Sequence, residues 1–293
     1  MPGILVDEDD VCFYITEKCN SNCIMCPMSL DSRKRGESMD DILWEQFEEH
    51  MPCEVPHITI TGGEPFLFYH KLIPALEKLN RIYPETEILI LTNGRVLSIP
   101  EIMDCLKPYI TRHYRFAIPI HGPNKYIHDA ITASSGSFLQ TISALHSLCE
   151  TEATIEVRIV GHQLNLQHIN ATYHMLSNLD ARIDVINLVA MEMTGCAARN
   201  RQQLWVDYLD LCEKSEEGIR DCILHGIDAG LYNFPLCQVP QRMWSLVKHS
   251  ITPSKVRFAP ECENCSQKDA CGGLFYSTYE LGLCKIKPFK EDK

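Results

Sequence analysis

Six short apolar runs, separated by segments with helical periodicity, constrain the fold of this chain more than any other feature of its sequence. The predicted strands cover residues 11–16, 57–61, 87–91, 115–120, 154–160 and 184–190. The predicted helices between them cover residues 40–50, 71–83, 99–106, 137–150 and 166–179. This alternation is typical of βα units, whose strands form a mainly parallel sheet. Six such units favour an incomplete βα barrel over a closed eight-unit barrel.

The length of 293 residues suits a barrel-sized domain with a smaller appendage. We therefore predict the α/β class, with a partial (β/α)6 TIM-like barrel and a small cysteine-rich C-terminal domain. The sequence LYNFP interrupts the helical pattern near residue 231, and we place the domain boundary there. The predicted divisions are an N-terminal segment 1–10, the barrel 11–200, a connecting helix 201–230 and the C-terminal domain 231–293.

The composition narrows the classes of function. No apolar run approaches the roughly 18 residues of a membrane-spanning helix, and no secretory signal precedes the first strand, so we expect a cytoplasmic protein without membrane contact. Fifteen cysteines in such a chain indicate reduced thiols that bind metal. The net charge of −12 argues against binding to duplex nucleic acid, which requires clustered positive charge. A polymer partner would more readily be a peptide.

The loop after the first predicted strand, TEKCNSNCIMCP, carries Cys19, Cys23 and Cys26 at CxxxCxxC spacing. These are three of the four ligands that an iron–sulfur cube requires, so one iron would remain free to bind a substrate or a cofactor. The alternative is a zinc site. Structural zinc prefers two closely spaced ligand pairs, and the sequence near this loop has no second pair.

Polar and glycine-rich residues follow the later strands, at the ends where barrels of this kind carry their active sites. The candidates are Gly62, Gly63, Glu64, Asn93, His121 and Arg158. We expect the two glycines to let the backbone approach a ligand, and Glu64 to accept a hydrogen bond from a cationic group. Arg158 lies in an apolar strand and therefore needs an anionic partner. The alternative for His121 is a structural histidine bonded to backbone.

CxxxCxxC after the first strand, GGEP after the second and TNG after the third resemble the motifs of radical S-adenosylmethionine (SAM) enzymes over about residues 11–200. The resemblance implies that Cys19, Cys23 and Cys26 hold a [4Fe–4S] cluster whose fourth iron binds the amino and carboxylate groups of SAM. It implies that the segment 62–64 binds the methionyl amine. It also implies that the ribose and the carboxylate are bound by Asn93, His121 and Arg158.

The same resemblance implies a mechanism. Reductive cleavage of SAM, with electrons from an external donor, would yield methionine and a 5′-deoxyadenosyl radical, which abstracts hydrogen from the substrate. The cofactor supplies this chemistry, and the protein supplies orientation and excludes side reactions.

A second group of cysteines lies near the C-terminus, where CENCSQKDACGG sets the spacing CxxC-x5-C. Spacing alone does not decide between zinc and a second iron–sulfur cluster. The pattern resembles SPASM and twitch extensions, but Phe275 stands where a further cysteine is expected, so we predict one auxiliary [4Fe–4S] cluster. The preferred ligands are Cys237, Cys262, Cys265 and Cys271, with Cys284 as the alternative for Cys237. The remaining cysteines are expected to be core residues: Cys12, Cys53, Cys105, Cys149, Cys196, Cys212 and Cys222.

Phrases along the chain, including HDAITASSGSF, MEMTGCAARNRQQLW and YNFPLCQVP, resemble the C-type radical SAM maturases of His-Xaa-Ser repeat peptide systems. That resemblance implies modification of a ribosomally made peptide, and a partner radical SAM protein. The chain begins just before its first barrel strand, and we expect precursor recognition to be delegated elsewhere. Two other interpretations stay open: a radical SAM enzyme acting on a free small molecule, such as a nucleotide or sugar, and a non-catalytic iron–sulfur or zinc protein that senses redox state or scaffolds a partner.

Overall fold

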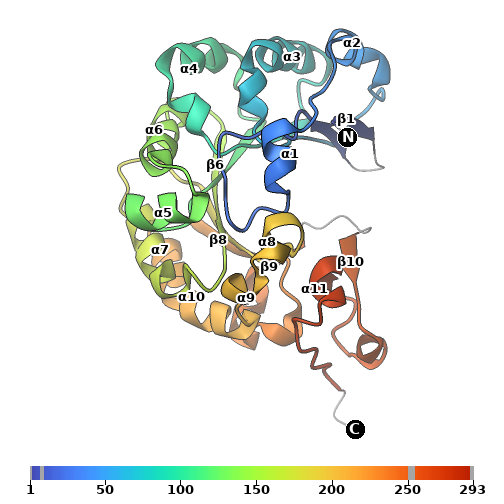
Figure 1. Cartoon of the computed structure of the whole chain (residues 1–293), viewed down its shortest axis with the longest axis vertical. Coiled ribbons are helices and arrows are strands. Elements are labelled where there is room, and N and C mark those ends of the chain that lie inside the picture. Colours follow the sequence, from blue (N-terminus) through green and yellow to red (C-terminus); the bar gives the residue numbers. More distant parts are fainter. Residues whose placement is uncertain (1, 7–9, 250–254, 291–293) are drawn as a thin grey trace.

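The computed structural model describes residues 2–6, 10–249 and 255–290, which form a curved sheet surrounded by helices (Figure 1). The strands follow one another across the main sheet in chain order. Those described in this sheet are β1 (Gly3–Val6), β2 (Val11–Tyr14), β3 (His57–Thr61), β4 (Glu87–Leu91), β5 (Tyr114–Pro119), β6 (Thr154–Val160), β7 (Val185–Val189), β8 (Asp228–Tyr232) and β9 (Val247–Lys248). β1 pairs antiparallel with β2, and the strands from β2 to β9 pair in parallel. The predicted α/β class, with the parallel sheet of a partial barrel, is confirmed.

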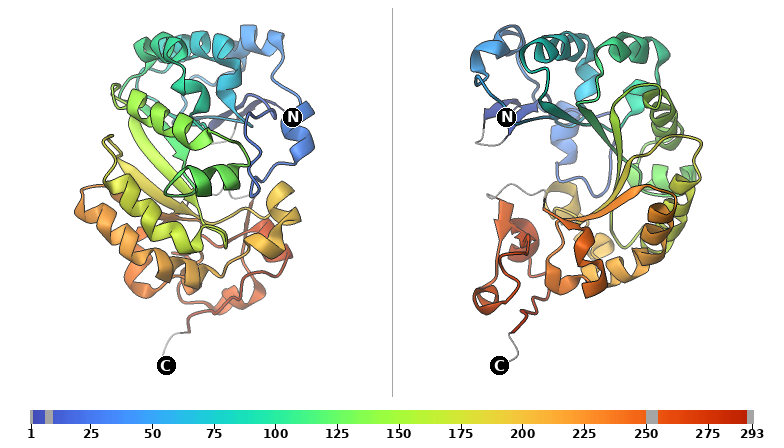
Figure 2. Two further views of the ribbon diagram at one scale, coloured as in Figure 1. Left: turned by 60° about the vertical axis from the view of Figure 1, so that its left-hand side comes forward. Right: turned by 180° about the vertical axis from the view of Figure 1, so that it is seen from behind.

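The helices described are α1 (Leu30–Arg35), α2 (Asp41–Gln46), α3 (Tyr69–Ile82), α4 (Pro100–Leu106), α5 (Lys125–Thr132), α6 (Ser137–Leu148), α7 (Ile169–Ser177), α8 (Gly195–Arg199), α9 (Arg201–Leu204), α10 (Tyr208–Leu224) and α11 (Tyr276–Glu280). Of these, α3, α4, α6, α7 and α10 cover the outer, convex face of the sheet (Figures 1 and 2). Among the residues that the structure describes, no helix combines the length and apolar character needed to cross a membrane.

The two faces of the sheet differ in polarity because alternate residues of a strand point to opposite sides. On the outer face, Ile58 and Ile60 of β3 and Phe116 of β5 are fully buried. On the inner face, residues such as His57 and Thr59 are only half-buried. The curved sheet therefore has an apolar side under the helices and a partly open polar side.

The sheet extends further along the chain than the six predicted strands. β8 pairs in parallel with β7, and β9 pairs with β8, so α10 completes another βα unit. The predicted boundary at residue 231 falls inside β8, and the predicted connecting helix 201–230 contains α9, α10 and the start of β8. The sequence of β8, DAGLY, has a weak strand signal because it includes a glycine. The glycine is needed at position 230, since a Cβ there would lie 2.4 Å from Asn187 Oδ1.

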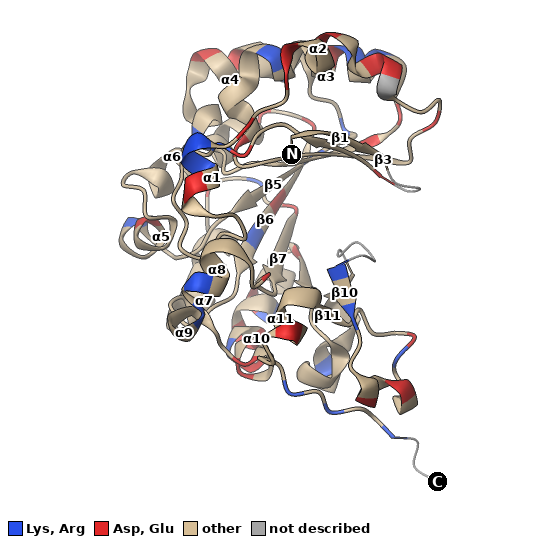
Figure 3. Cartoon of the chain, turned by 45° about the vertical axis from the view of Figure 1, so that its right-hand side comes forward, with Lys and Arg blue, Asp and Glu red and all other residues tan. Residues whose placement is uncertain are grey.

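The C-terminal segment shares its hydrophobic core with the barrel. Phe234, Met243 and Leu274 belong to the same buried cluster as the strand residues of the barrel. In this segment β10 (Val256–Arg257) pairs antiparallel with β11 (Leu274–Phe275). Viewed as in Figure 3, these strands and α11 lie across the open side of the curved sheet from β1.

Candidate active site

The loop with the first three cysteines lies at the carboxyl end of β2, between β2 and α1. It ends where the Ser29 side chain accepts a hydrogen bond from the N–H of Ser32 and caps α1. Burial, with a smaller contribution from neighbouring cysteines, raises the pKa of the Cys19 thiol to about 11 and that of Cys23 to about 12. Burial also raises the pKa of Cys26. The three thiols thus lie within electrostatic range of one another in a poorly solvated loop.

Backbone donors surround two of these sulfur atoms. The N–H of Ser21 donates to Cys19 Sγ at 3.4 Å, and the N–H of Met28 donates to Cys26 Sγ at 3.4 Å. Hydrogen bonds of this kind favour the negatively charged form of an acceptor. These donors therefore partly oppose the effect of burial on the pKa of Cys19 and Cys26.

The loop after β3 lies against the cysteine loop. The N–H of Gly63 donates to the Thr16 carbonyl at 2.6 Å, and the N–H of Glu64 donates to the Lys18 carbonyl at 2.9 Å. A Cβ added to Gly62, which has a φ of 151°, would lie 2.5 Å from the Thr16 carbonyl oxygen. A Cβ added to Gly63 would lie 2.2 Å from the Lys18 carbonyl oxygen. The backbone that these glycines approach is that of the cysteine loop, whereas the sequence had suggested a ligand.

The Glu64 carboxylate is fully buried and joins the second loop to the third. It accepts hydrogen bonds from the Thr92 hydroxyl at 2.7 Å, the Asn93 N–H at 2.8 Å and the Phe66 N–H at 3.1 Å. Burial raises its pKa to about 6, against the opposing effect of these donors. The carboxylate therefore holds the loops together. The sequence had suggested that it would accept a hydrogen bond from a cationic ligand, but it is not exposed to one.

The loop after β4 contacts the cysteine loop directly. Asn93 Nδ2 donates to Asn20 Oδ1 at 2.7 Å and lies 3.7 Å from Cys19 Sγ. Arg95 donates to the Asn20 carbonyl and to Ser21 Oγ, the latter at 3.0 Å. The loops after β2, β3 and β4 thus form one hydrogen-bonded unit. The contribution of Arg95 was missed, although a cation directly after TNG was the available signal.

His121 lies in a buried histidine cluster formed with His128 and His162. The rings of His121 and His128 stack with their centroids 5.7 Å apart, and the His121 N–H donates to His128 Nδ1 at 3.2 Å. Among the residues that the structure describes, His121 Nδ1 and both ring nitrogens of His162 are buried without a hydrogen-bond partner. His121 is 1% exposed, so its ring lies inside the end of the barrel and not on an open surface.

This cluster predicts a loss of stability in acid. Burial lowers the pKa of His128 and of His162 to about 4, so the unfolded chain binds protons before the native state does as the pH falls. As the pH falls from about 6.5 to about 5, the free energy of unfolding should decrease by about 2 kcal/mol for each of these two histidines. Urea unfolding of the iron-free protein should show this fall, and His162→Gln should remove one such contribution.

His146→Gln is the matched control, because His146 is exposed on α6. The prediction is wrong if His162→Gln and the parental protein lose equal stability over this pH range.

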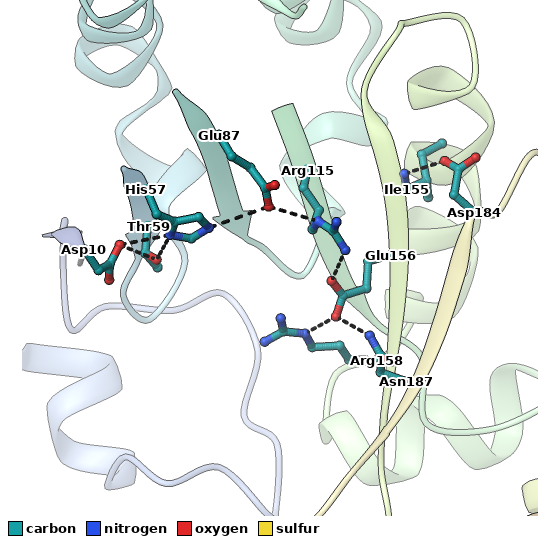
Figure 4. A network of polar contacts seen from close by, with 10 residues as sticks. All are labelled: Asp10, His57, Thr59, Glu87, Arg115, Ile155, Glu156, Arg158, Asp184 and Asn187. Atoms are coloured by element: carbon teal, nitrogen blue, oxygen red, sulfur yellow. Dashed lines mark hydrogen bonds and ion pairs between the residues drawn. The ribbon is translucent and has the colours of Figure 1, made fainter. Parts of the chain in front are cut away.

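Arg158 takes part in a polar network on the inner face of the sheet (Figure 4). Its Nε donates to Glu156 Oε1 at 2.6 Å, and its guanidinium lies over the Tyr232 ring at 5.5 Å. Glu156 is fully buried and also accepts from Asn187 Nδ2 at 2.8 Å and pairs with Arg115 at 3.5 Å. The anionic partner that Arg158 required is thus Glu156, two residues earlier in the same strand.

The network continues across the sheet away from Arg158. Arg115 pairs with Glu87 at 3.2 Å, and Glu87 lies 3.6 Å from His57, which contacts Asp10 at 3.1 Å (Figure 4). Among the contacts described, none joins Arg158 to the loops that carry Cys19, Glu64 and Asn93. The structure thus brings together the candidates after β2, β3 and β4, and places Arg158 in a separate group.

The segment that begins α8 holds the cysteine loop from the other side. The N–H groups of Cys196 and Ala197 donate to the Cys26 carbonyl at 3.0 and 3.2 Å, and Asn200 Nδ2 donates to the Ile24 carbonyl at 2.8 Å. These contacts join positions about 170 residues apart, so no local pattern pointed to them. Cys196, expected only to fill the core, is buried beside this loop.

Four cysteines of the C-terminal segment line one pocket. They are Cys237, Cys262, Cys265 and Cys271. The N–H of Leu236 donates to Cys271 Sγ and the N–H of Phe289 to Cys265 Sγ, both at 3.4 Å. Cys284 packs against the hydrophobic core instead. The preferred four thiols thus line one pocket, and Cys284 lies outside its lining but within electrostatic range of Cys237, Cys262 and Cys271.

Comparisons with known proteins agree with this geometry. The model of the Radical SAM superfamily matches residues 13–176. The chain is 23% identical over 210 residues to the probable dual-specificity RNA methyltransferase RlmN of Desulfitobacterium hafniense, covering 65% of this chain and 57% of that protein.

Two groups of solved structures have a similar fold. Streptococcus suis SuiB bound to its precursor peptide SuiA superposes with a TM-score of 0.60 at 13% identity, covering 78% of this chain and 49% of SuiB. The structure of anSMEcpe with bound AdoMet gives a TM-score of 0.52 at 16% identity, covering 75% of this chain and 62% of that one. The chain therefore spans less than two thirds of each of these relatives, and the structural likeness concerns the fold.

Proposed function

Because this chain belongs to the radical SAM superfamily, we propose that it is an enzyme that cleaves SAM and modifies a ribosomally made peptide. One observation carries the proposal. The cysteine loop lies at one end of a parallel sheet, where Asn93 Nδ2 is 3.7 Å from Cys19 Sγ. The carboxyl end of the strands is where such barrels carry their active sites.

The chemistry of the cysteine loop fits a [4Fe–4S] cluster better than zinc. A single zinc ion draws its ligands to about 2.3 Å from one centre. Across the residues described, no three His, Cys, Asp or Glu side chains are arranged to hold a single metal ion. A cubane cluster takes its cysteine ligands on separate irons, so its thiolates need not converge on one point. Cys19, Cys23 and Cys26 would bind three irons and leave the fourth open.

When bound, the cluster and SAM would supply one-electron cleavage of SAM to methionine and a 5′-deoxyadenosyl radical, which abstracts hydrogen from the substrate. The chain's own residues hold and orient the site. The half-exposed backbone of Gly62 and Gly63 is the better candidate to bind the methionyl amine, because the Glu64 carboxylate is buried and already accepts three hydrogen bonds. Asn93 would orient the bound cofactor beside Cys19.

The remaining candidates require different roles. His121 is buried in the histidine cluster, so its contribution would be to shape the end of the barrel and not to touch the ribose directly. Arg158 is half-buried on the inner face of the sheet, where its Nε donates to Glu156 and its guanidinium lies over the Tyr232 ring (Figure 4). We propose that Arg158 binds a carboxylate there, either of SAM or of the substrate.

The C-terminal segment supports a peptide substrate. Cys237, Cys262, Cys265 and Cys271 line one pocket in an element that shares its core with the barrel, and we propose that they bind one auxiliary [4Fe–4S] cluster. SuiB, whose fold is similar, was solved with a precursor peptide. Together with the sequence motifs, this supports a precursor of the His-Xaa-Ser type and a partner radical SAM protein.

The test is SAM cleavage by the anaerobically reconstituted full chain. After reduction with dithionite, we expect 5′-deoxyadenosine to form, and we expect a deuterated His-Xaa-Ser precursor to transfer deuterium into it. A protein with a full cluster that makes no 5′-deoxyadenosine would overturn the enzymatic assignment and favour the redox or scaffold alternative. Deuterium transfer from a nucleoside or sugar, but not from the peptide, would favour the small-molecule alternative.

A further inference from the structure

Arg33, in the first helix after the cysteine loop, is a buried cation with no carboxylate partner among the described residues. It is 2% exposed. Its Nη1 donates to the Ser21 carbonyl at 3.2 Å, its Nε donates to the Ser29 carbonyl at 3.4 Å, and its Nη2 donates to Cys196 Sγ at 3.1 Å. Burying a charge is costly unless an opposite charge compensates it. The surroundings of Arg33 therefore lack the anion that a buried guanidinium requires.

The guanidinium of Arg33 is held against the loop that carries the three thiols. The N–H of Cys19 donates to the Arg33 carbonyl at 3.1 Å, which fixes the start of the loop to α1. The Ser21 carbonyl, to which its Nη1 donates, lies between Cys19 and Cys23 in the loop, and the positive charge of Arg33 acts on all three thiols. The guanidinium therefore lies within electrostatic range of each proposed iron ligand.

Cys196 anchors the other end of the guanidinium. Its sulfur accepts the Nη2 hydrogen bond, and its own N–H donates to the Cys26 carbonyl at 3.0 Å. Both residues are almost completely buried. α8, the cysteine loop and Arg33 are thus fixed to one another.

We propose that Arg33 is the buried counter-cation of the three-cysteine cluster, held in place by Cys196, and that its charge raises the reduction potential of that cluster. This inference rests on the proposed function, since it requires the cluster in that loop. A cluster held by thiolates is negatively charged and gains a further negative charge on reduction, and nearby charge is one of the factors that set its potential. A fixed buried cation stabilises the reduced form more than the oxidised form.

Arg95 provides a matched control, because it is a second arginine that donates to the same loop. It donates to Ser21 Oγ at 3.0 Å and to Gln140 Oε1 at 2.7 Å. It is only half-buried, and its charge acts on Glu64 and His128. Removing Arg95 therefore removes a loop contact and leaves the charge next to the cluster in place.

The experiment is a redox titration of the full iron-loaded protein, followed by electron paramagnetic resonance on the signal that added SAM perturbs. For Arg33→Met we expect the equilibrium constant for one-electron reduction to fall at least about tenfold, which corresponds to ~59 mV. Arg33→Lys keeps the charge, and Arg95→Met keeps Arg33, so both should stay within about threefold of the parental protein. Cys196→Ala should lower the constant by less than Arg33→Met.

Each outcome decides the proposal. If Arg33→Met keeps its full iron content and its cluster has the same reduction potential as that of the parental protein, the proposal is wrong. If the cluster of Cys196→Ala has a higher reduction potential than the parental cluster, the anchoring role of Cys196 is wrong. If Arg33→Met loses the cluster, the Arg33→Lys variant decides. An intact cluster with the parental potential in Arg33→Lys supports the charge role. Loss of the cluster in Arg33→Lys as well would overturn the charge role and show that the hydrogen bonds of Arg33 to the loop hold the cluster. Iron content and potential do not depend on SAM cleavage, so failure of the proposed enzyme activity would be seen separately.

Discussion

Replacing Cys23 by alanine should abolish formation of 5′-deoxyadenosine from SAM. The backbone on either side of Cys23 is held by α5, because the N–H of Asn22 donates to the Thr132 carbonyl and the N–H of Ile24 donates to the Ile131 carbonyl, both at 3.0 Å. None of these bonds uses the thiol. The substitution should therefore remove a ligand while leaving the fold of the loop in place.

A loop with two thiolates cannot hold the cluster that leaves one iron open for SAM. We expect Cys23→Ala to lose about four irons per chain, and 5′-deoxyadenosine to fall below about a thousandth of the parental rate, because the chemistry depends wholly on the cluster. Iron analysis of the purified protein and chromatography of the reaction products measure the two effects.

The control for this substitution is Cys105→Ala, because Cys105 is exposed on α4 and lies in none of the contacts around the loop. It should retain the parental iron content and activity. If Cys23→Ala produced 5′-deoxyadenosine at the parental rate, the assignment of the cluster to this loop would be wrong.

Replacing Cys265 by alanine should halve the iron content and stop peptide modification. The parental protein, purified without oxygen, should contain about eight irons, four for each of two cubane clusters. Cys265 ends a 3-10 helix over Pro260–Asn264, where its N–H donates to the Cys262 carbonyl at 3.1 Å, and its sulfur accepts from the Phe289 N–H. Loss of this thiol therefore removes one ligand from a pocket whose backbone is fixed on both sides.

The cysteine loop after β2 is formed by other parts of the chain, so Cys265→Ala should still cleave SAM without modifying the peptide. Cys53→Ala is the control, because Cys53 is exposed and does not line the pocket, so its loss should leave both clusters intact. The opposing hypothesis, a structural zinc ribbon, predicts one tightly held zinc and about four irons in the parental protein. That metal content would remove the auxiliary cluster and weaken the assignment of a peptide substrate.

The sequence alone determined the class of the fold and the ends of the strands at which the site lies. Alternating apolar runs and helical periods are local patterns, so β2 to β7 were predicted close to their observed bounds. The motifs follow these strands directly, and parallel strands bring their carboxyl ends to one edge. For this reason the approach of Asn93 to the cysteine loop followed from chain order.

Only the tertiary structure decided which charges pair and which side chains face the site. Glu64 and His121 have site-like positions in the sequence, but packing from distant segments buries both. Glu156 became the partner of Arg158, and a contact with Cys196, 163 residues away, helps to hold Arg33 against the cysteine loop. The physical reason is that the environment of a charge depends on every segment folded against it. Local periodicity records only which side of its own strand or helix a residue occupies.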